Sequence, residues 1–160
     1  MAGGEARATV HALLTKVADA ARNADVFADV TVDDGAVRCV ARDAAAHAEF
    51  RLCLEDGGLW VGMYTPDRWL SQSIEADLMH TGDKLEDLID EELVDLGCDA
   101  GPLPFEHFRN DDKEYVFRSP TPFSLDAPAE DASRVAGLCL LAYEAAMREL
   151  GDMSGGEDKD

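Results

Sequence analysis

Hydrophobic and polar positions change period along the chain, and each change predicts a new element. Near the start, apolar residues recur at the spacing of one helical face: Val10, Leu13, Leu14, Val17 and Ala21. This spacing predicts an amphipathic helix over about residues 5–23. The period then becomes two, which predicts a strand with Ala28 and Val30 on one face and Phe27 on the other. The turn Asp33-Asp34-Gly35 indicates a hairpin with a second strand ending near Arg42.

A second hairpin has two strands of different character. From Glu49 to Glu55, apolar side chains alternate with polar ones, as expected for a strand with one face in water. The turn Asp56-Gly57-Gly58 leads into a strand from Leu59 to Tyr64 that is apolar on both faces. A strand covered on both sides is central in its sheet or lies in a subunit interface. Helices on one face and a second protomer on the other would cover both faces of this strand.

Two helices are predicted in the middle of the chain. We place Thr65 as the N-cap of the first and Pro66 as its first helical residue, because a hydroxyl caps a helix and proline starts one well. This helix runs to about Met79. The sequence Thr81-Gly82-Asp83 then interrupts the pattern, and a second striped helix follows that stops at Gly97.

The last part of the chain adds a hairpin and a long helix. Strands over Phe105–Arg109 and Glu114–Ser119 are joined by a polar turn. An apolar stripe predicts a final helix that ends near Leu150. Residues 151–160 are polar and acidic, and we expect them to form a disordered tail.

These elements predict a single α+β domain over residues 5–150. It contains an antiparallel sheet of about five to six strands packed against N-terminal, central and C-terminal helices. A chain of 160 residues that is 46% hydrophobic is long enough for one core and short for two. No apolar run reaches the length of a membrane helix, and the first residues lack the pattern of a signal peptide. We therefore expect a cytoplasmic protein without a membrane partner.

Charge narrows the possible functions. The chain has 34 acidic and 14 basic residues, a formal net charge of −20. Such a charge disfavours nucleic acid and anionic membranes as partners. Two explanations remain open: a salt-adapted housekeeping domain without a dedicated partner, or an acidic surface that faces a basic ligand or a client protein. Complete folding in dilute buffer would argue against obligate dependence on salt.

Few residues form a pattern that carries chemistry. The chain has no nucleophile motif, phosphate loop or dinucleotide fingerprint. Its four cysteines are widely spaced without a C-x-x-C pair, which indicates buried, reduced thiols rather than a zinc site. We expect a non-catalytic protein without cofactor or metal. The alternative is a small metal-dependent enzyme or metal-binding domain that uses Glu75, Asp77 and His80, since Asp77 and His80 are three residues apart on a predicted helix.

Two sets of side chains are candidates for binding a partner. The first supplies apolar contacts and consists of aromatic residues: Trp60, Tyr64, Trp69, Tyr115 and Phe117. The second guides the approach of a partner electrostatically and lies on the short helix before Gly97: Asp87, Asp90, Glu91 and Asp95. Together they favour a module that binds a segment of a partner protein.

The order of elements resembles that of the class I type III secretion chaperones and the YbjN-like proteins. The resemblance covers roughly Glu5 to Leu150 and rests on that order, on small size and on acidity. The segment Trp60-Val61-Gly62-Met63-Tyr64 corresponds to the strand before the central helix, and Phe105 to Phe117 to the late hairpin. The resemblance implies an acidic homodimer that holds a client segment against apolar patches, without enzymatic activity. The two-part middle helix departs from the single dimer-forming element of those families.

Overall fold

The computed structural model describes residues 2–33, 35–42, 44–55, 58–98, 103–121, 129–151 and 153. The helices and strands, in chain order, are α1 (Ala2–Ala24), β1 (Phe27–Asp33), β2 (Ala36–Ala41), β3 (Glu49–Glu55), β4 (Gly58–Thr65), α2 (Arg68–Thr81), α3 (Leu85–Asp95), β5 (Glu106–Arg109), β6 (Tyr115–Pro120) and α4 (Ala129–Met147). This is the predicted order, and the predicted α+β class is confirmed.

All strand pairs of the sheet are antiparallel. The six strands lie in the order β1-β2-β3-β4-β6-β5, so the sheet has one edge at β1 and the other at β5. Strand β4 pairs with β3 on one side and β6 on the other. The central position predicted for the strand that is apolar on both faces is therefore confirmed.

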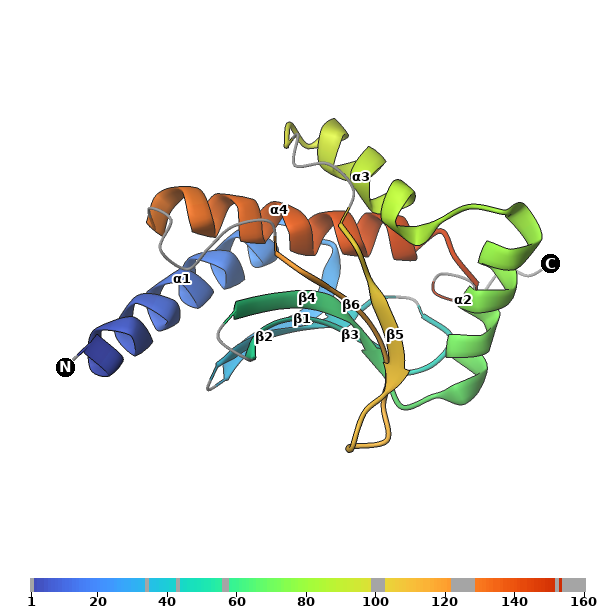
Figure 1. Ribbon diagram of the computed structural model, residues 1–160, viewed down its shortest axis with the longest axis horizontal. Helices are drawn as coiled ribbons and strands as arrows, with labels where there is room; N and C mark the ends of the chain where they lie inside the picture. Colours follow the sequence, from blue (N-terminus) through green and yellow to red (C-terminus); the bar gives the residue numbers. More distant parts are fainter. Residues whose placement is uncertain are drawn as a thin grey trace.

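The helices form two layers on one side of the sheet (Figure 1). Helices α1 and α4 lie directly on the sheet, and α3 lies on the outer side of α4. Helix α2 stands at the end of the sheet, close to the C-terminal end of α4. Because α4 contacts the sheet, α1 and α3, it is surrounded on several sides.

The composition of α4 reflects this position. The apolar stripe of the sequence predicts a buried face made of Val135, Leu138, Cys139, Ala142, Ala146 and Leu150. The last four of these are buried, whereas Val135 and Leu138 are partly exposed. A further set of α4 side chains is also buried, at no more than 3% exposure: Ala132, Ala136, Leu140, Tyr143 and Met147. The hydroxyl of Tyr143 lies 2.6 Å from that of Ser119 on β6, so a buried hydrogen bond joins α4 to the sheet.

The face assignment in β1 is wrong because of a bulge. We expected Ala28 to share a face with Val30, but Ala28 is exposed and Phe27 is 5% exposed. The pairing of β1 with β2 shifts register between Phe27 and Asp29. A bulge adds one residue to the strand, which reverses the faces before it. Phe27 thereby enters the core, with its ring centroid 5.8 Å from that of Phe50.

The start of α2 is also later than predicted. The N-cap is Asp67, whose carboxylate accepts a hydrogen bond from the Leu70 backbone N–H at 2.8 Å. Thr65 is instead the last residue of β4, and its hydroxyl donates to the carbonyl of His47 at 2.7 Å. The same hydroxyl accepts a hydrogen bond from the Asp67 backbone N–H at 3.0 Å. Because β4 extends through Thr65, the helix begins at Arg68 and Asp67 takes the capping position.

The domain continues past the end that the sequence predicts. We expected the tail to begin at Gly151, but its backbone N–H donates to the Asp77 carboxylate of α2 at 2.8 Å. Met153 is 2% exposed and belongs to the hydrophobic core. The chain therefore contributes to the core as far as Met153. The remainder of the expected tail, residues 152 and 154–160, lies outside the described residues.

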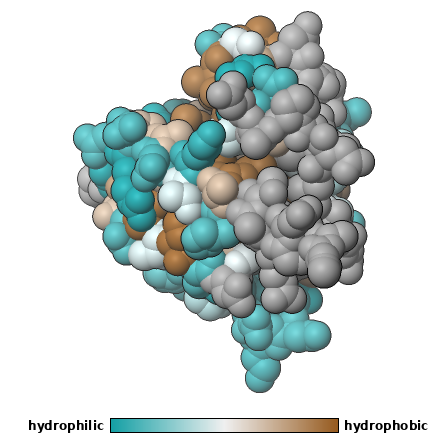
Figure 2. Space-filling model, turned by 90° about the vertical axis from the view of Figure 1, so that its left-hand side faces the viewer, coloured by the Kyte–Doolittle hydropathy of each residue, from teal (hydrophilic) through white to brown (hydrophobic). Residues whose placement is uncertain are grey.

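On the face shown in Figure 2, hydrophilic residues surround small hydrophobic areas. Among the described residues, no helix has both the length and the apolar character needed to cross a membrane. The larger exposed apolar side chains are few: Leu54, Trp69, Met79, Val94 and Leu96. These positions are candidates for a binding surface.

The accessibility of the cysteines gives a direct check of the fold. None of the four is in a disulfide, and Cys39, Cys98 and Cys139 are buried while Cys53 is partly exposed. Burial raises the pKa of Cys39 and of Cys139 to about 12, which keeps both thiols protonated and unreactive. We expect one reactive thiol per native chain and four after denaturation, measured by titration with a chromogenic disulfide. Cys53→Ser should have none; a native count above one would contradict the packing described.

Candidate partner-binding surface

One side of the sheet carries no helix in the part of the chain that the structure describes (Figure 1). On β4, Val61 and Met63 point to the helices and belong to the core, so Trp60 and Tyr64 point the other way. The register brings Arg51 of β3 and Arg118 of β6 to this same side. We call it the open face.

Arginine side chains cover the aromatic rings of the open face. The guanidinium carbon of Arg118 lies 4.1 Å from the centre of the Trp60 ring and 5.0 Å from that of Phe108. The guanidinium carbon of Arg51 lies 4.3 Å from the centre of the Tyr64 ring. A guanidinium is planar and weakly hydrated, so it stacks on aromatic rings with little loss of hydration. These arginines supply the cover that we had expected from a second protomer, and Tyr64 is only 5% exposed.

A network of carboxylates holds the stacked arginines in place. Arg51 donates to both carboxylate oxygens of Glu114, at 3.0 and 2.7 Å, and to Glu49 at 2.8 Å. Arg118 donates to Glu106 at 3.2 Å. Partial burial acts to raise the pKa of Glu49 and of Glu114, but the bonds from Arg51 outweigh it and both pKa values lie below the usual range. Both carboxylates are therefore ionised partners of Arg51 at neutral pH.

Gly62 lets β4 and β6 approach closely beneath the stack. A Cβ atom at Gly62 would lie 2.3 Å from the carbonyl oxygen of Phe117 and 2.7 Å from the Cβ of Arg118. Such contacts cannot form without moving one of the two strands. Only glycine fits at this position of the central strand.

Removing Arg51 tests the role of this network. Arg51→Ala leaves two partly buried carboxylates without their shared partner and uncovers Tyr64. We expect the free energy of unfolding to fall by about 3 kcal/mol, as for other broken ion pairs with little exposure. Chemical denaturation measures it. Asp19→Ala is the control, because its ion pair with Arg22 is exposed and should contribute about 0.5 kcal/mol, while the bond from Arg22 to the Val30 carbonyl is kept.

Acid titration of the same variant gives a second readout. A carboxyl group whose pKa is lowered by folding stabilises the fold above its unfolded pKa, near 4.5, and this contribution is lost as pH falls through the folded pKa. The wild type should therefore lose more stability between pH 7 and acidic pH than Arg51→Ala does. Equal losses would show that Glu49 and Glu114 are not stabilised by Arg51.

Two of the predicted contact residues lie on the other side of β6. Phe117 is 1% exposed and packs in the core, so it cannot contact a partner. The His107 ring of β5 stacks on Phe117 with centroids 3.9 Å apart, and it also pairs with Glu75 of α2. Tyr115 is partly exposed, with the guanidinium of Arg109 5.7 Å from its ring centre. Phe117 is thus a structural residue that ties the hairpin to the core.

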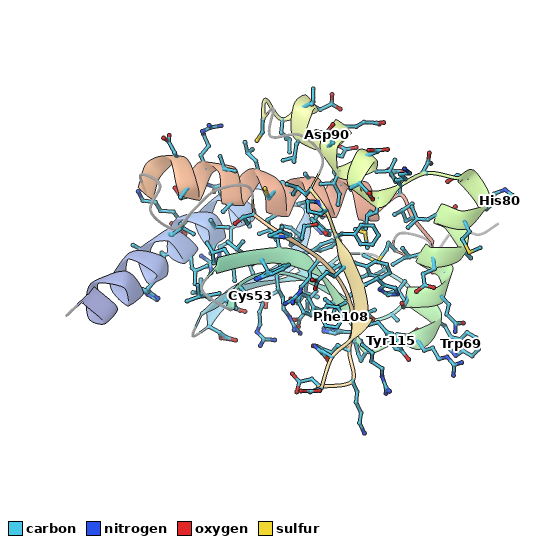
Figure 3. All side chains as sticks on the ribbon, viewed as in Figure 1. Cys53, Trp69, His80, Asp90, Phe108 and Tyr115 are labelled. Atoms are coloured by element: carbon cyan, nitrogen blue, oxygen red, sulfur yellow. The ribbon has the colours of Figure 1, made fainter. Side chains whose placement is uncertain are left out.

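Trp69 is the one predicted aromatic contact that is highly exposed. Its side chain is 71% exposed and points away from α2 (Figure 3). Further exposed and uncharged residues follow it at the spacing of one helical face: Gln72, Ala76, Met79 and His80. We call these residues and Trp69 the α2 stripe. Met79 is 84% exposed, which is the greatest exposure of any large apolar side chain described.

The α2 stripe ends at a hollow beside the turn between α2 and α3. This hollow, which we call the apolar groove, has a volume of about 300 Å³. It is lined by apolar side chains and by the polar residues of the turn: Leu78, Met79, Gly82, Asp83, Lys84, Leu85, Glu86 and Phe105. Gly82 has φ of 78°, the left-handed conformation that ends α2 and that glycine adopts without strain. Phe105, before β5, reaches this turn from a distant part of the chain.

A second hollow lies on the other side of the same turn, against α4. This acidic cleft has a volume of about 180 Å³, and Asp83 lines both hollows. Its lining combines five carboxylates with a threonine and three apolar side chains: Asp77, Thr81, Asp83, Leu88, Glu91, Glu92, Ala146, Glu149 and Leu150. Partial burial and the nearby carboxylate of Asp95 raise the pKa of Glu92. The cleft is therefore a concentration of negative charge.

The acidic residues predicted to guide a partner are placed in two ways. Asp87, Glu91 and Asp95 are exposed on α3, as that role requires. Asp90, also on α3 (Figure 3), is only partly exposed, and its Oδ1 atom is buried without a hydrogen bond to any described residue. Glu91 alone of the four lines the acidic cleft. The exposed three remain available to a partner, whereas Asp90 turns one oxygen inward.

The residues of the alternative metal hypothesis have separate partners. Glu75 pairs with His107, and Asp77 accepts the backbone N–H of Gly151. His80 is exposed on the outer side of α2 (Figure 3). Within the described residues, no group of three or more His, Cys, Asp or Glu side chains is arranged to hold a metal ion.

Several residues of the surface carried no signal in the sequence. Met79 and Leu78 were assigned to the end of a helix, and Phe105 to the start of a strand. Phe105 follows Met79 by 26 positions, and nothing in the sequence indicates that the two side chains line one groove. The exposed positions i, i+7 and i+10 of the α2 stripe were the available signal, since they place Trp69, Ala76 and Met79 on one uncharged face.

Comparison with known proteins adds no relative. No family model, curated protein or solved structure matches this chain. A function for this chain therefore rests on the geometry of its surface.

Proposed function

We propose that this protein is a non-catalytic, cytoplasmic protein-binding module that holds a segment of a client protein on the α2 stripe and in the apolar groove. The observation that carries the proposal is the exposure of Trp69 and Met79, 71% and 84%, on one face of α2. The guanidinium carbon of Arg68 lies 5.8 Å from the centre of the Trp69 ring, so the face is bordered by a cation but carries no carboxylate. In a chain with net charge −20, such an apolar face is an unusual surface to leave in water. Tryptophan is among the residues that contribute most to protein interfaces.

The attachment of α2 supports this role. Leu70, Ser71 and Ile74 form its buried face, so the exposed stripe lies on the opposite side of a well-anchored helix. Both ends of α2 are fixed: Asp67 caps the start, and Gly82 closes the end. A surface on a rigid helix loses little conformational entropy when a partner binds.

The order of elements, on which the resemblance to the class I type III secretion chaperones rests, also fits a client-holding role. A fold alone supports function only by analogy, so the exposed stripe is the stronger argument. Homodimerisation is part of the same proposal, and light scattering coupled to size exclusion measures it.

Panning a phage-displayed library of random peptides tests the proposal. The wild type should enrich peptides that the double variant Trp69→Ser/Met79→Ser does not bind. Because both side chains are highly exposed, the variant should remain folded. Burial of either side chain in a complex contributes about 2 kcal/mol, so losing both should weaken binding by at least about tenfold.

Leu54→Ser is the matched control, since Leu54 is an exposed apolar residue on β3, away from α2. It should bind the enriched peptides as the wild type does. Peptides that bind all three proteins equally, or no enrichment at all, would contradict the proposed surface.

A further inference from the structure

The turn between α2 and α3 separates an apolar hollow from an acidic one, and the two share Asp83. The apolar groove presents Leu78, Met79, Leu85 and Phe105. The acidic cleft begins on the far side of the same turn. A ligand that occupies both must therefore place an apolar group and a cationic group within a few bonds of each other.

The charge of the cleft lacks a counter-charge in its own walls. Five of its lining residues carry carboxylates, and none of its lining residues is Lys, Arg or His. Arg148, in the segment after α4, donates to Glu144 at 3.0 and 2.5 Å. Its charge also acts to lower the pKa of Glu92, but partial burial and the neighbouring carboxylates outweigh it, so that pKa stays raised. A cation in this cleft would relieve the repulsion.

The groove next to it accepts an apolar side chain. Met79 is 84% exposed at its edge, and its flexible thioether adapts to side chains of different shape. Asp83 and Glu86 place further negative charge on the rim, opposed by Lys84 alone. A volume of about 300 Å³ is at the small end of the range for binding pockets, which suits one or two side chains rather than a folded domain.

A second copy of this chain is a poor occupant of the paired hollows. It would bring its own acidic α3 and its net charge of −20 against the five carboxylates of the cleft. Like charges at an interface oppose association. Charge complementarity instead favours a partner segment that carries basic side chains.

We infer that the client segment pairs a bulky apolar side chain with a Lys or Arg beside it, the first bound in the apolar groove and the second in the acidic cleft. This inference rests on the proposed function and names the chemistry of the client. The apolar group provides most of the affinity by leaving water. The cation fixes the direction of the segment across the turn and speeds its encounter with an acidic protein.

Two synthetic peptides test the inference. In the first peptide, each Leu has one Lys at the next position and another Lys one helical turn away. The second peptide has Gln in place of every Lys. Trp60→Phe leaves Trp69 as the only tryptophan, so a blue shift of its emission reports binding on α2. The Lys peptide should bind about 5- to 20-fold more tightly than the Gln peptide, and the difference should shrink with added salt.

A charge-matched pair of variants localises the effect. Glu91→Gln/Glu149→Gln removes two carboxylates from the cleft, and Asp111→Asn/Asp112→Asn removes two exposed ones from the β5–β6 turn. The first pair should weaken binding of the Lys peptide by about 5-fold or more, and the second by less than about 2-fold. Met79→Ser should weaken binding of both peptides.

Each other outcome overturns the inference. Equal effects of the two variant pairs would mean that only net charge attracts the peptide. Equal binding of the Lys and Gln peptides, with both lost in Met79→Ser, would remove the cationic requirement and leave the proposed function standing. A third outcome is that neither peptide binds and the protein has twice the molar mass of one chain, a mass that Met79→Ser halves. The α2 stripe would then bind a second copy of the chain.

Discussion

The stacking of Arg51 and Arg118 on the aromatic side chains of β4 is the interaction on which the rest of the structure depends. Strand β4 is apolar on both faces, but helices cover only one of them in the described structure. The guanidinium groups, 4.3 and 4.1 Å from the ring centres of Tyr64 and Trp60, take the place of a second layer. They bring charge to the surface while shielding apolar rings from water, which neither an aliphatic nor an acidic side chain achieves. Side chains of the chain itself thereby cover the aromatic rings of the open face.

The largest exposed apolar side chains of the described structure are instead on α2. Once the sheet is closed by arginines, the most exposed apolar side chains are Trp69 and Met79, both on one helix. Carboxylates of α3 and of Glu149, in the segment after α4, lie beside the turn where the stripe ends. An apolar contact bordered by charge of one sign is selective for partners that combine apolar and basic groups.

Much of the fold can be predicted from the hydrophobic pattern of the sequence, but the candidate binding surface cannot. Alternation and helical stripes predict the ten elements in order and the central place of β4, because burial imposes its period on the sequence. Two local features explain the errors. Strand β4 continues through Thr65, so Asp67 caps α2, and a bulge brings Phe27 rather than Ala28 into the core. The aromatic residues were misassigned for a different reason. Composition makes Trp60, Trp69 and Phe117 equally good candidates for binding a partner. Their exposure differs because it depends on which arginine or helix covers each ring, and this is decided by the tertiary structure.

Hydrogen–deuterium exchange of the full chain, with and without a peptide selected for binding, tests the central claim most directly. If the client segment lies on α2 and the following turn, exchange slows across residues 68–86 and stays unchanged in β2 and β3. Slower exchange in β3 and β4, with α2 unchanged, would place the client on the open face and contradict the account.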